Sequence, residues 1–252
     1  MSTRMTIGNQ PIVLDNLTHS YDFTDYVSGA TVNDMVTTTQ SGSLSNTPDH
    51  NKIGWIELDG VNQHLSLSND HRLGDSGPIM TIEMGFRIPT GTSNTVWLMT
   101  TNGGSVDIES QSSSHTYALA RKADGKLTTQ AYISSNFSST RQKSSTSLTV
   151  ANNVWYHMSI LFYDRSSSDG HIGYNVKLNN VNYIDTDFDS SGIATPYRFN
   201  GANKVLVIGR DGRSGSNYYP LEVAYWRRYS SELTDKQRTQ NYNHHAARFG
   251  AY

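Results

Sequence analysis

The sequence predicts an all-β protein, a two-sheet antiparallel β-sandwich followed by a short C-terminal helix. Apolar and polar residues alternate with a period of two in many short segments, as in strands that bury one face. Polar turns separate these segments, and an amphipathic helix pattern appears only after residue 230. Many short strands with one helix favour two packed sheets over an α/β arrangement.

The strand pattern is clearest in two segments. In residues 81–88, one face carries apolar side chains and the other carries Thr81, Glu83 and Arg87. Residues 154–164 are apolar on both faces, which is typical of a central strand in a packed sandwich. The core positions expected in this second segment are Trp155, Met158 and Phe162. Further strands are expected in residues 12–23, 54–60, 64–68, 170–178, 203–210 and 220–226.

The segments between these strands have the composition of turns and loops. Asp124-Gly125 lies between two alternating runs in residues 117–133 and predicts a tight hairpin. Residues 36–51 are polar and are expected to form a loop within, or leading into, the same domain. The Ser- and Thr-rich residues 134–147 are expected to form a long exposed loop.

The C-terminal helix has a clear start signal. Thr234 and Gln237 have the spacing of a capping box, in which each side chain satisfies a backbone N–H of the first turn. Asp235 would lie in that turn, where a negative charge is favourable against the helix dipole. The helix is expected to continue to about His245.

Composition favours one domain and excludes several classes of protein. The 252 residues suit one large sandwich over residues 13–252, preceded by an arm or edge strand over residues 1–12. There is no cysteine, and therefore no disulfide or thiolate metal site. A net charge of −2 without a basic run argues against a nucleic-acid partner. The mean hydropathy of −0.55, with no long apolar run, argues against membrane insertion.

No arrangement of residues predicts catalysis. Glu57 and Asp59 alternate on one strand, as catalytic carboxylates of some glycosidases do, but a second glutamate is missing. The chain has neither a G-x-S-x-G nor an H-E-x-x-H motif, and His157 is expected to be a packed or edge histidine of its strand. We therefore expect no catalytic residue and a protein that is not an enzyme.

Three aspartates suggest one metal site. Asp185, Asp187 and Asp189 alternate as the ligands of a calcium loop do. Ser190 stands where such a loop requires glycine, and Pro196 stands where it requires the bidentate glutamate. A solvated strand end is the alternative interpretation, so no cofactor is predicted and calcium alone is left open.

A glycine-rich loop supplies the candidate ligand-binding residues. Arg210, Arg213, Tyr218 and Tyr219 lie in "IGRDGRSGSNYYP", which combines guanidinium donors with aromatic faces suited to a sugar or a protein. The loop follows a strand but opens no helix, and so fails the context of a dinucleotide site. An ordinary loop with locally packed tyrosines is the alternative.

Segments in a fixed order resemble laminin-G-like domains of the concanavalin A-like lectin/glucanase fold. They are "LDGVNQHLSL" at residues 58–67, "WYHMS" at 155–159, "VKLNN" at 176–180, and "IGR" at 208–210 followed by "LEVAYWRRYSSELTDKQ" at 221–237. The resemblance implies a jelly roll whose last strand returns beside the first. It also implies that Leu221, Val223 and Tyr225 fill the core and that Arg228 lies at the following turn.

The N-terminal part resembles the opening of laminin-G-like modules in bacteriophage structural proteins. Residues 12–67 carry the likeness, with "GSLSNTPDHNKIGWIELDG" as its centre. This implies a non-enzymatic virion protein, decorating a capsid or forming part of a tail or fibre, with other virion proteins or sister subunits as partners in a homo-oligomer. No secretory signal is visible, which fits synthesis in the host cytoplasm and a place on the virion surface.

Two alternatives remain open at the level of sequence. The first is a carbohydrate-binding adhesin or receptor-binding module that recognises a host-surface glycan. The second is a glycoside hydrolase or lyase whose catalytic residues follow no recognised pattern. Fold alone does not decide between them, because the same sandwich carries unrelated functions.

Overall fold

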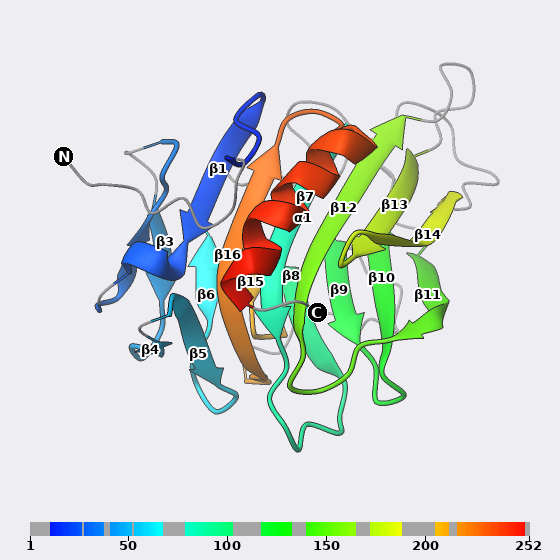
Figure 1. Cartoon of the computed structure of the whole chain (residues 1–252). Coiled ribbons are helices and arrows are strands. Elements are labelled where there is room, and N and C mark those ends of the chain that lie inside the picture. The colour runs from blue at the N-terminus through cyan, green and yellow to red at the C-terminus, as the bar shows by residue number, and fades with distance from the viewer. Residues whose placement is uncertain are drawn as a thin grey trace.

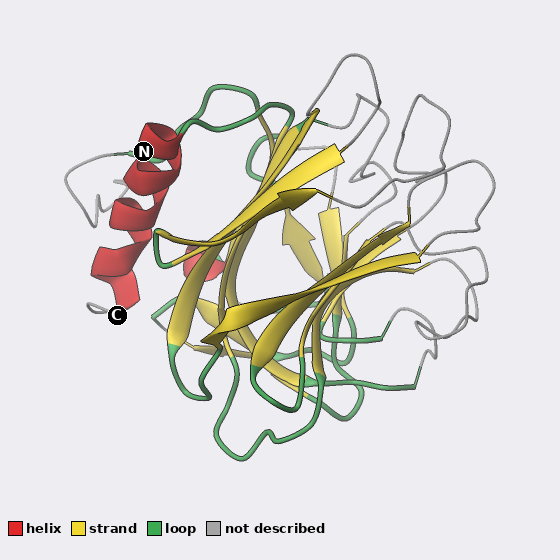
Figure 2. Cartoon of the chain, turned by 90° about the vertical axis from the view of Figure 1, so that its right-hand side faces the viewer, coloured by secondary structure: helices red, strands yellow, loops and turns green. Residues whose placement is uncertain are grey.

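Two antiparallel sheets pack face to face, and helix α1 lies against the outer side of one of them (Figure 1; Figure 2). The computed structural model describes residues 11–26, 28–37, 41–51, 53–67, 79–102, 117–132, 140–164, 172–187, 205–211 and 216–249. This arrangement confirms the predicted two-sheet sandwich with a C-terminal helix.

The sheet under the helix, called sheet A, has the strand order β14-β13-β12-β7-β16-β5-β4, with β1 paired to β16. Its strands are β1 (Leu17–Asp22), β4 (Asp49–Asn51), β5 (Trp55–Asp59), β7 (Met80–Arg87), β12 (Trp155–Asp164), β13 (Ile172–Leu178), β14 (Val181–Asp187) and β16 (Pro220–Tyr229). A short 3-10 helix, η1 (Phe23–Asp25), follows β1.

The opposite sheet, called sheet B, has the order β11-β10-β9-β8-β15-β6-β3-β2. Its strands are β2 (Thr31–Asn33), β3 (Ser41–Leu44), β6 (Leu65–Leu67), β8 (Val96–Asn102), β9 (Tyr117–Arg121), β10 (Lys126–Tyr132), β11 (Thr140–Thr149) and β15 (Val205–Ile208). Helix α1 spans Asp235–Phe249, and none of the described helices is long and apolar enough to cross a membrane.

The core lies between the sheets and follows the predicted alternation. Ile82, Met84 and Phe86 of β7 are fully buried there, and Met84 pairs with Met158 of β12. Phe162 of β12 is also fully buried and pairs with Met80. The other face of β7 is buried as well, because α1 covers sheet A. The antiparallel pairing of β9 with β10 across Asp124-Gly125 confirms the expected hairpin, and β12 pairs with β13 in the same antiparallel way.

The "LDGVN" motif has a structural explanation at the end of β5. Asp59 Oδ1 accepts hydrogen bonds from the backbone N–H groups of Val61, Asn62 and Gln63. Gly60 has φ +75°, and a Cβ there would meet Pro220 at 2.5 Å. The carboxylate therefore stabilises a tight turn, which accounts for its place in the motif.

The last strand closes sheet A as the resemblance implied, because β16 pairs with β1. The expectation for Tyr225 was wrong. The pairing of β16 with β7 shifts register between Val223 and Tyr225, so Tyr225 packs beneath α1 while Trp226 enters the core. Arg228 was also misplaced: it lies within β16, 6% exposed, because the strand continues to Tyr229.

Two polar segments contain strands that their composition concealed. Residues 134–147 were expected to be a loop, but Thr140–Thr149 forms β11, at the edge of sheet B. Residues 36–51 include β3 and β4. Short or peripheral strands carry a weak apolar signal, since fewer of their side chains enter the core.

The capping box at the start of α1 is confirmed. Gln237 N donates to Thr234 Oγ1 at 3.3 Å, and Thr234 N donates to Gln237 Oε1 at 2.9 Å. The helix continues one turn beyond the predicted end. Phe249 stacks on Trp155 with ring centroids 4.4 Å apart, so the last turn is stabilised by aromatic packing on sheet A.

We predict that Phe162→Ala lowers the free energy of unfolding by about 3–5 kcal/mol, because the ring is fully buried and its removal leaves a cavity. Urea denaturation measures the change. Val181→Ala is the control, since Val181 is 53% exposed, and should cost under about 1 kcal/mol. Equal effects of the two substitutions would contradict the position of β12 in the core.

Candidate functional site

The candidate loop begins where β15 ends. Gly209 has φ +78°, and a Cβ there would meet the Leu58 side chain at 2.3 Å, so the turn requires glycine. Beyond it, Arg210 and Tyr218 form an antiparallel bridge, and Tyr219 N donates to Gly209 O at 2.9 Å. The structure thus brings Arg210, Tyr218 and Tyr219 together at one end of sheet B. Arg213, predicted with them, lies outside the described residues.

Other aromatic side chains gather beside this bridge. The half-buried Tyr219 packs against Trp97 of β8 and Ala120 of β9. The ring of Tyr218 lies 5.7 Å from the ring of His64, which precedes β6. Residues from four neighbouring segments of sheet B therefore meet here, and neither Trp97 nor His64 was among the predicted site residues. His64 directly precedes β6, and Trp97 is the second residue of β8. In the sequence alone, residues in such positions look like packed strand residues and not like ligand-binding residues.

Two buried polar atoms at this place have no hydrogen-bond partner in the part of the chain that the structure describes: Arg210 Nε and His64 Nδ1. His64 Nε2 contacts Ser45 Oγ at 3.3 Å. Burial, followed by the charge of Arg210, lowers the pKa of His64 to about 4, so its imidazole is neutral at pH 7. A guanidinium donor, a neutral imidazole and tyrosine faces are thus grouped in one place, which suits a polar ligand with a ring. We call His64, Arg210, Tyr218 and Tyr219, with Trp97, the tyrosine–arginine cluster.

The predicted calcium ligands do not form a described site. Asp185 and Asp187 lie in β14, paired with Asn175 and Gly173 of β13, and Asp189 lies outside the described residues. Within the described ranges, no group of three or more His, Asp or Glu side chains could hold a metal ion. Calcium binding by this segment stays a prediction.

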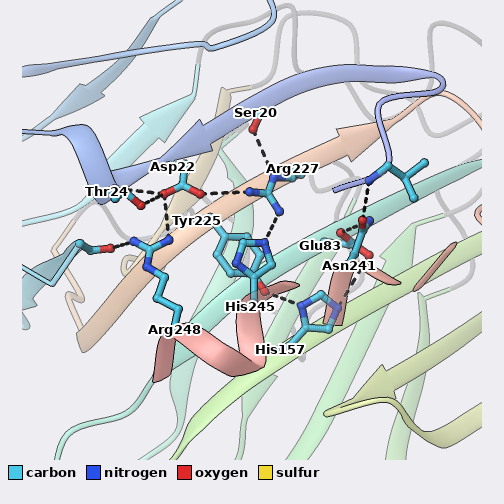
Figure 3. Close-up of polar contacts among 12 residues, drawn as sticks. Ser20, Asp22, Thr24, Glu83, His157, Tyr225, Arg227, Asn241, His245 and Arg248 are labelled. Atoms are coloured by element: carbon cyan, nitrogen blue, oxygen red, sulfur yellow. Dashed lines mark hydrogen bonds and ion pairs between the residues drawn. The ribbon is translucent and has the colours of Figure 1, made fainter. Parts of the chain in front are cut away.

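A second group of polar residues, which the sequence did not reveal, lies between sheet A and α1 (Figure 3). We call it the buried polar network. It comprises Ser20, Asp22, Glu83, His157, Tyr225, Arg227, Asn241, His245 and Arg248. His157 confirms the expectation of a packed histidine, being 1% exposed. The helix residues of the network could have been found from the sequence. Polar residues recur there at helical spacing and form one polar face: Arg238, Asn241, His245 and Arg248.

Glu83 is the carboxylate at the centre of this network. Its Oε2 accepts a hydrogen bond from Asn241 Nδ2 at 2.9 Å, and its Oε1 lies 3.8 Å from His157 Nε2. His157 Nδ1 in turn contacts the hydroxyl of Tyr225, whose ring stacks on His245 with centroids 3.8 Å apart. Strands β7, β12 and β16 are thereby joined to the helix by polar contacts.

Asp22 anchors the cationic side of the network. Its carboxylate accepts from Arg227 Nη2 at 3.0 Å and from Arg248 Nη1 at 2.9 Å. Burial acts to raise the pKa of Asp22, but Arg248 and Arg227 hold it below its usual value, so Asp22 stays ionised. Arg227 also contacts His245 Nε2, and Arg248 donates to the carbonyl of Gly54.

The part of the network around Glu83, His157 and His245 is closed to solvent, which limits its chemistry. Glu83 is 0% exposed and His245 is 1% exposed. A carboxylate beside histidines is a common acid–base pair, but a substrate has no access to atoms buried beneath a helix. The arrangement can hold the helix on the sheet and exchange protons as the pH changes, and nothing in its geometry presents a reacting group to a ligand.

No family model matches the chain, and no curated protein matches it. Solved structures do. The receptor-binding domain of botulinum neurotoxin C/D mosaic serotype matches with a TM-score of 0.62 and 13% identity, over 90% of this chain and 51% of that one. The ligand-binding domain of serotype D, solved with N-acetylneuraminic acid, gives 0.62 and 13%, over 90% and 50%. Trypanosoma rangeli sialidase, solved with sialic acid, gives 0.64 and 11%, over 92% and 35%.

These likenesses confirm a jelly-roll-like β-sandwich. At such low identity they show the fold alone. The chain spans about half of the neurotoxin domains and about a third of the sialidase.

The buried polar network predicts an unusual pH dependence of stability. Burial, then Arg227 and Arg238, lowers the pKa of His157 to about 3, and the pKa of His245 is also lowered well below 6.5. Below pH 6.5 the unfolded chain gains protons at these histidines that the folded chain does not, so stability falls. Burial raises the pKa of Glu83 from 4.5 to about 7, so the folded chain gains a proton there between pH 7 and 4.5, and stability rises.

We predict that Glu83→Gln removes this compensation. Between pH 7.5 and 5.5 the variant should lose about 1–2 kcal/mol more of its free energy of unfolding than the unsubstituted protein does. Urea denaturation across that range measures the difference in slope. Glu232→Gln, at an exposed glutamate before the helix, is the matched control. Parallel pH profiles for Glu83→Gln and the unsubstituted protein would contradict the role given to Glu83.

Proposed function

We propose that the protein is a non-enzymatic recognition module that binds a glycan through the tyrosine–arginine cluster. The observation that carries this proposal is the pair of buried polar atoms without partners, Arg210 Nε and His64 Nδ1, beside the faces of Tyr218 and Tyr219. A sugar offers hydroxyl groups to such atoms and an apolar ring face to the aromatic side chains.

Two further observations support a binding role over catalysis. Two of the similar structures hold sialic acid or N-acetylneuraminic acid, so sandwiches of this fold occur in proteins that engage sugars. The carboxylate–histidine pair of Glu83 and His157 is enclosed beneath α1, and the pair of Asp34 and His19 is buried as well. The absence of an enzymatic activity is part of the proposal, and turnover of a bound glycan would contradict it.

We predict that Tyr218→Ala weakens binding to the best glycan of an array by about tenfold or more, because it removes the aromatic face beside Arg210. Isothermal titration calorimetry measures the affinity. Tyr218→Phe keeps the ring and should retain most of the binding, whereas Arg210→Gln should weaken it through loss of the charged donor. If the array shows no binding, or if all three variants bind like the unsubstituted protein, the proposal fails.

The setting we propose is the surface of a bacteriophage virion, as a laminin-G-like module of a capsid, tail or fibre. This part is supported by the likeness of residues 12–67 to phage modules. A host-surface glycan would then be the ligand, and repeated copies on a symmetric particle would raise the effective affinity of weak single contacts. Sister subunits and other virion proteins would be the assembly partners.

We predict that deletion of residues 2–10 leaves the sandwich folded but abolishes incorporation into particles. The first described residues are held by the helix: Pro11 O accepts from Gln240 Nε2 at 2.7 Å, and Val13 N donates to Asn241 Oδ1 at 2.8 Å. These contacts survive the deletion. Circular dichroism tests the fold, and imaging of purified particles with a labelled copy tests incorporation. Normal copy number of the truncated protein would rule out the arm as the tether.

A further inference from the structure

A cavity of about 380 Å³ lies at one end of the sandwich, where three connections meet. These are the β7–β8 loop, the β9–β10 hairpin and the β11–β12 loop, all at the lower end of the molecule in Figure 1. The cavity is lined by Gly91, Thr92, Ser93, Arg121, Ala123, Asp124, Gly125, Thr149, Val150, Ala151 and Asn152. Most of these residues are polar or expose backbone groups, which suits a hydrated ligand more than an apolar one.

Arg121, the last residue of β9, is the only basic side chain of this lining and is 3% exposed. Its Nη2 donates to Thr92 O at 2.7 Å and to Asn152 Oδ1 at 2.5 Å. Its Nη1 makes longer contacts, with Lys122 O at 3.3 Å and Asn94 O at 3.5 Å. Each of these acceptors is a neutral oxygen, and among the described residues no carboxylate pairs with the guanidinium.

The charge of Arg121 is therefore buried without compensation. Its Nε is enclosed and has no hydrogen-bond partner within the described ranges. An arginine stays protonated in proteins, and burial of a cation without an opposite charge is costly. Asp22, by contrast, pairs with two arginines, so the charges of that group compensate one another. The neutral oxygens around Arg121 orient the guanidinium beside the cavity without neutralising its charge.

We propose that this cavity binds the carboxylate of an acidic sugar, with Arg121 as the cation that selects it. The sugar as ligand rests on the proposed function, while the anion site rests on Arg121. A single guanidinium matches one negative charge. Asp124, which also lines the cavity, would repel a dianion such as phosphate more strongly than a monoanion, and it would accept hydrogen bonds from sugar hydroxyl groups.

The cavity lies close to the tyrosine–arginine cluster in the fold. Arg121 pairs with Val96, the first residue of β8, and Trp97 of the cluster is the next residue. Strand β8 also borders β15, which leads into Arg210. Both sites therefore lie at the same end of sheet B, on neighbouring strands. An extended acidic glycan would place its carboxylate at Arg121 and another ring against the tyrosines.

The test uses d-glucuronate, its neutral methyl ester and inorganic phosphate as probes of the full chain. Binding is followed by NMR through the amide signals of Gly91 and Gly125, which line the cavity. Glucuronate should bind about tenfold or more tightly than its ester, because the ester loses the attraction between the carboxylate and the positive charge of Arg121. Arg121→Gln should abolish that preference. No glucuronate binding at these signals, equal binding of the ester, or tighter binding of phosphate would overturn the proposal.

Arg121→Gln could unfold the protein, since Arg121 makes hydrogen bonds to several loops. A second pair of variants therefore tests the anion site without changing Arg121. Ser93 lies exposed on the cavity lining, so Ser93→Glu places a carboxylate there and should weaken glucuronate binding about tenfold, whereas the equally large Ser93→Gln should not. Equal affinities of these two variants would count against an anion site. The experiment also distinguishes failure of the proposed function from failure of the anion site. If the tyrosine–arginine cluster does not bind a glycan, Tyr218→Ala leaves array binding unchanged while glucuronate still shifts the Gly91 and Gly125 signals.

Discussion

The ion pairs of Asp22 with Arg227 and Arg248 are the interaction on which the outer layer of the protein depends. They join β1, β16 and α1, three elements that lie at opposite ends of the chain. Two buried guanidinium groups require a buried carboxylate, because removing either sign leaves an uncompensated charge in a medium of low polarisability. Once Asp22 is in place, the helix can cover sheet A with a polar face, and Glu83, His157 and Asn241 find their partners there.

This polar layer also explains why sheet A is buried on both faces. An amphipathic helix usually covers a sheet with an apolar stripe. Here the apolar contacts of α1 are concentrated at its last turn, where Phe249 meets Trp55 and Trp155. The remaining contacts include the stacking of His245 on Tyr225 and many hydrogen bonds and ion pairs. These directional polar contacts fix the rotation of the helix about its own axis more sharply than apolar packing would.

Local signals in the sequence predicted the elements that local physics determines. The alternation of residues 81–88, the Asp124-Gly125 hairpin and the Thr234–Gln237 capping box each require only neighbouring residues, and each is confirmed. Tyr225 could not be placed, since the register shift beside Val223 reverses the face that later residues of β16 present. Of the predicted ligand-binding residues, three come together, while the positions of His64, Trp97 and Arg121 near them depend on the pairing of strands distant in sequence.

The pairing of Leu17 with Tyr229 has a consequence for how the chain folds. Strand β16 is central in sheet A, with β5 and β7 also hydrogen-bonded to it, yet it is the last in chain order of the strands that the structure describes. Until it emerges from the ribosome, β1 and β5 expose edges that have no partner, and β7 lacks one neighbour. Closing contacts over nearly the whole length of the chain is slow, because loop-closure entropy must be overcome first. The half-made sheet is therefore the state in which this protein is most exposed to pairing with another chain, and chaperone contact is most useful before residue 229 is translated.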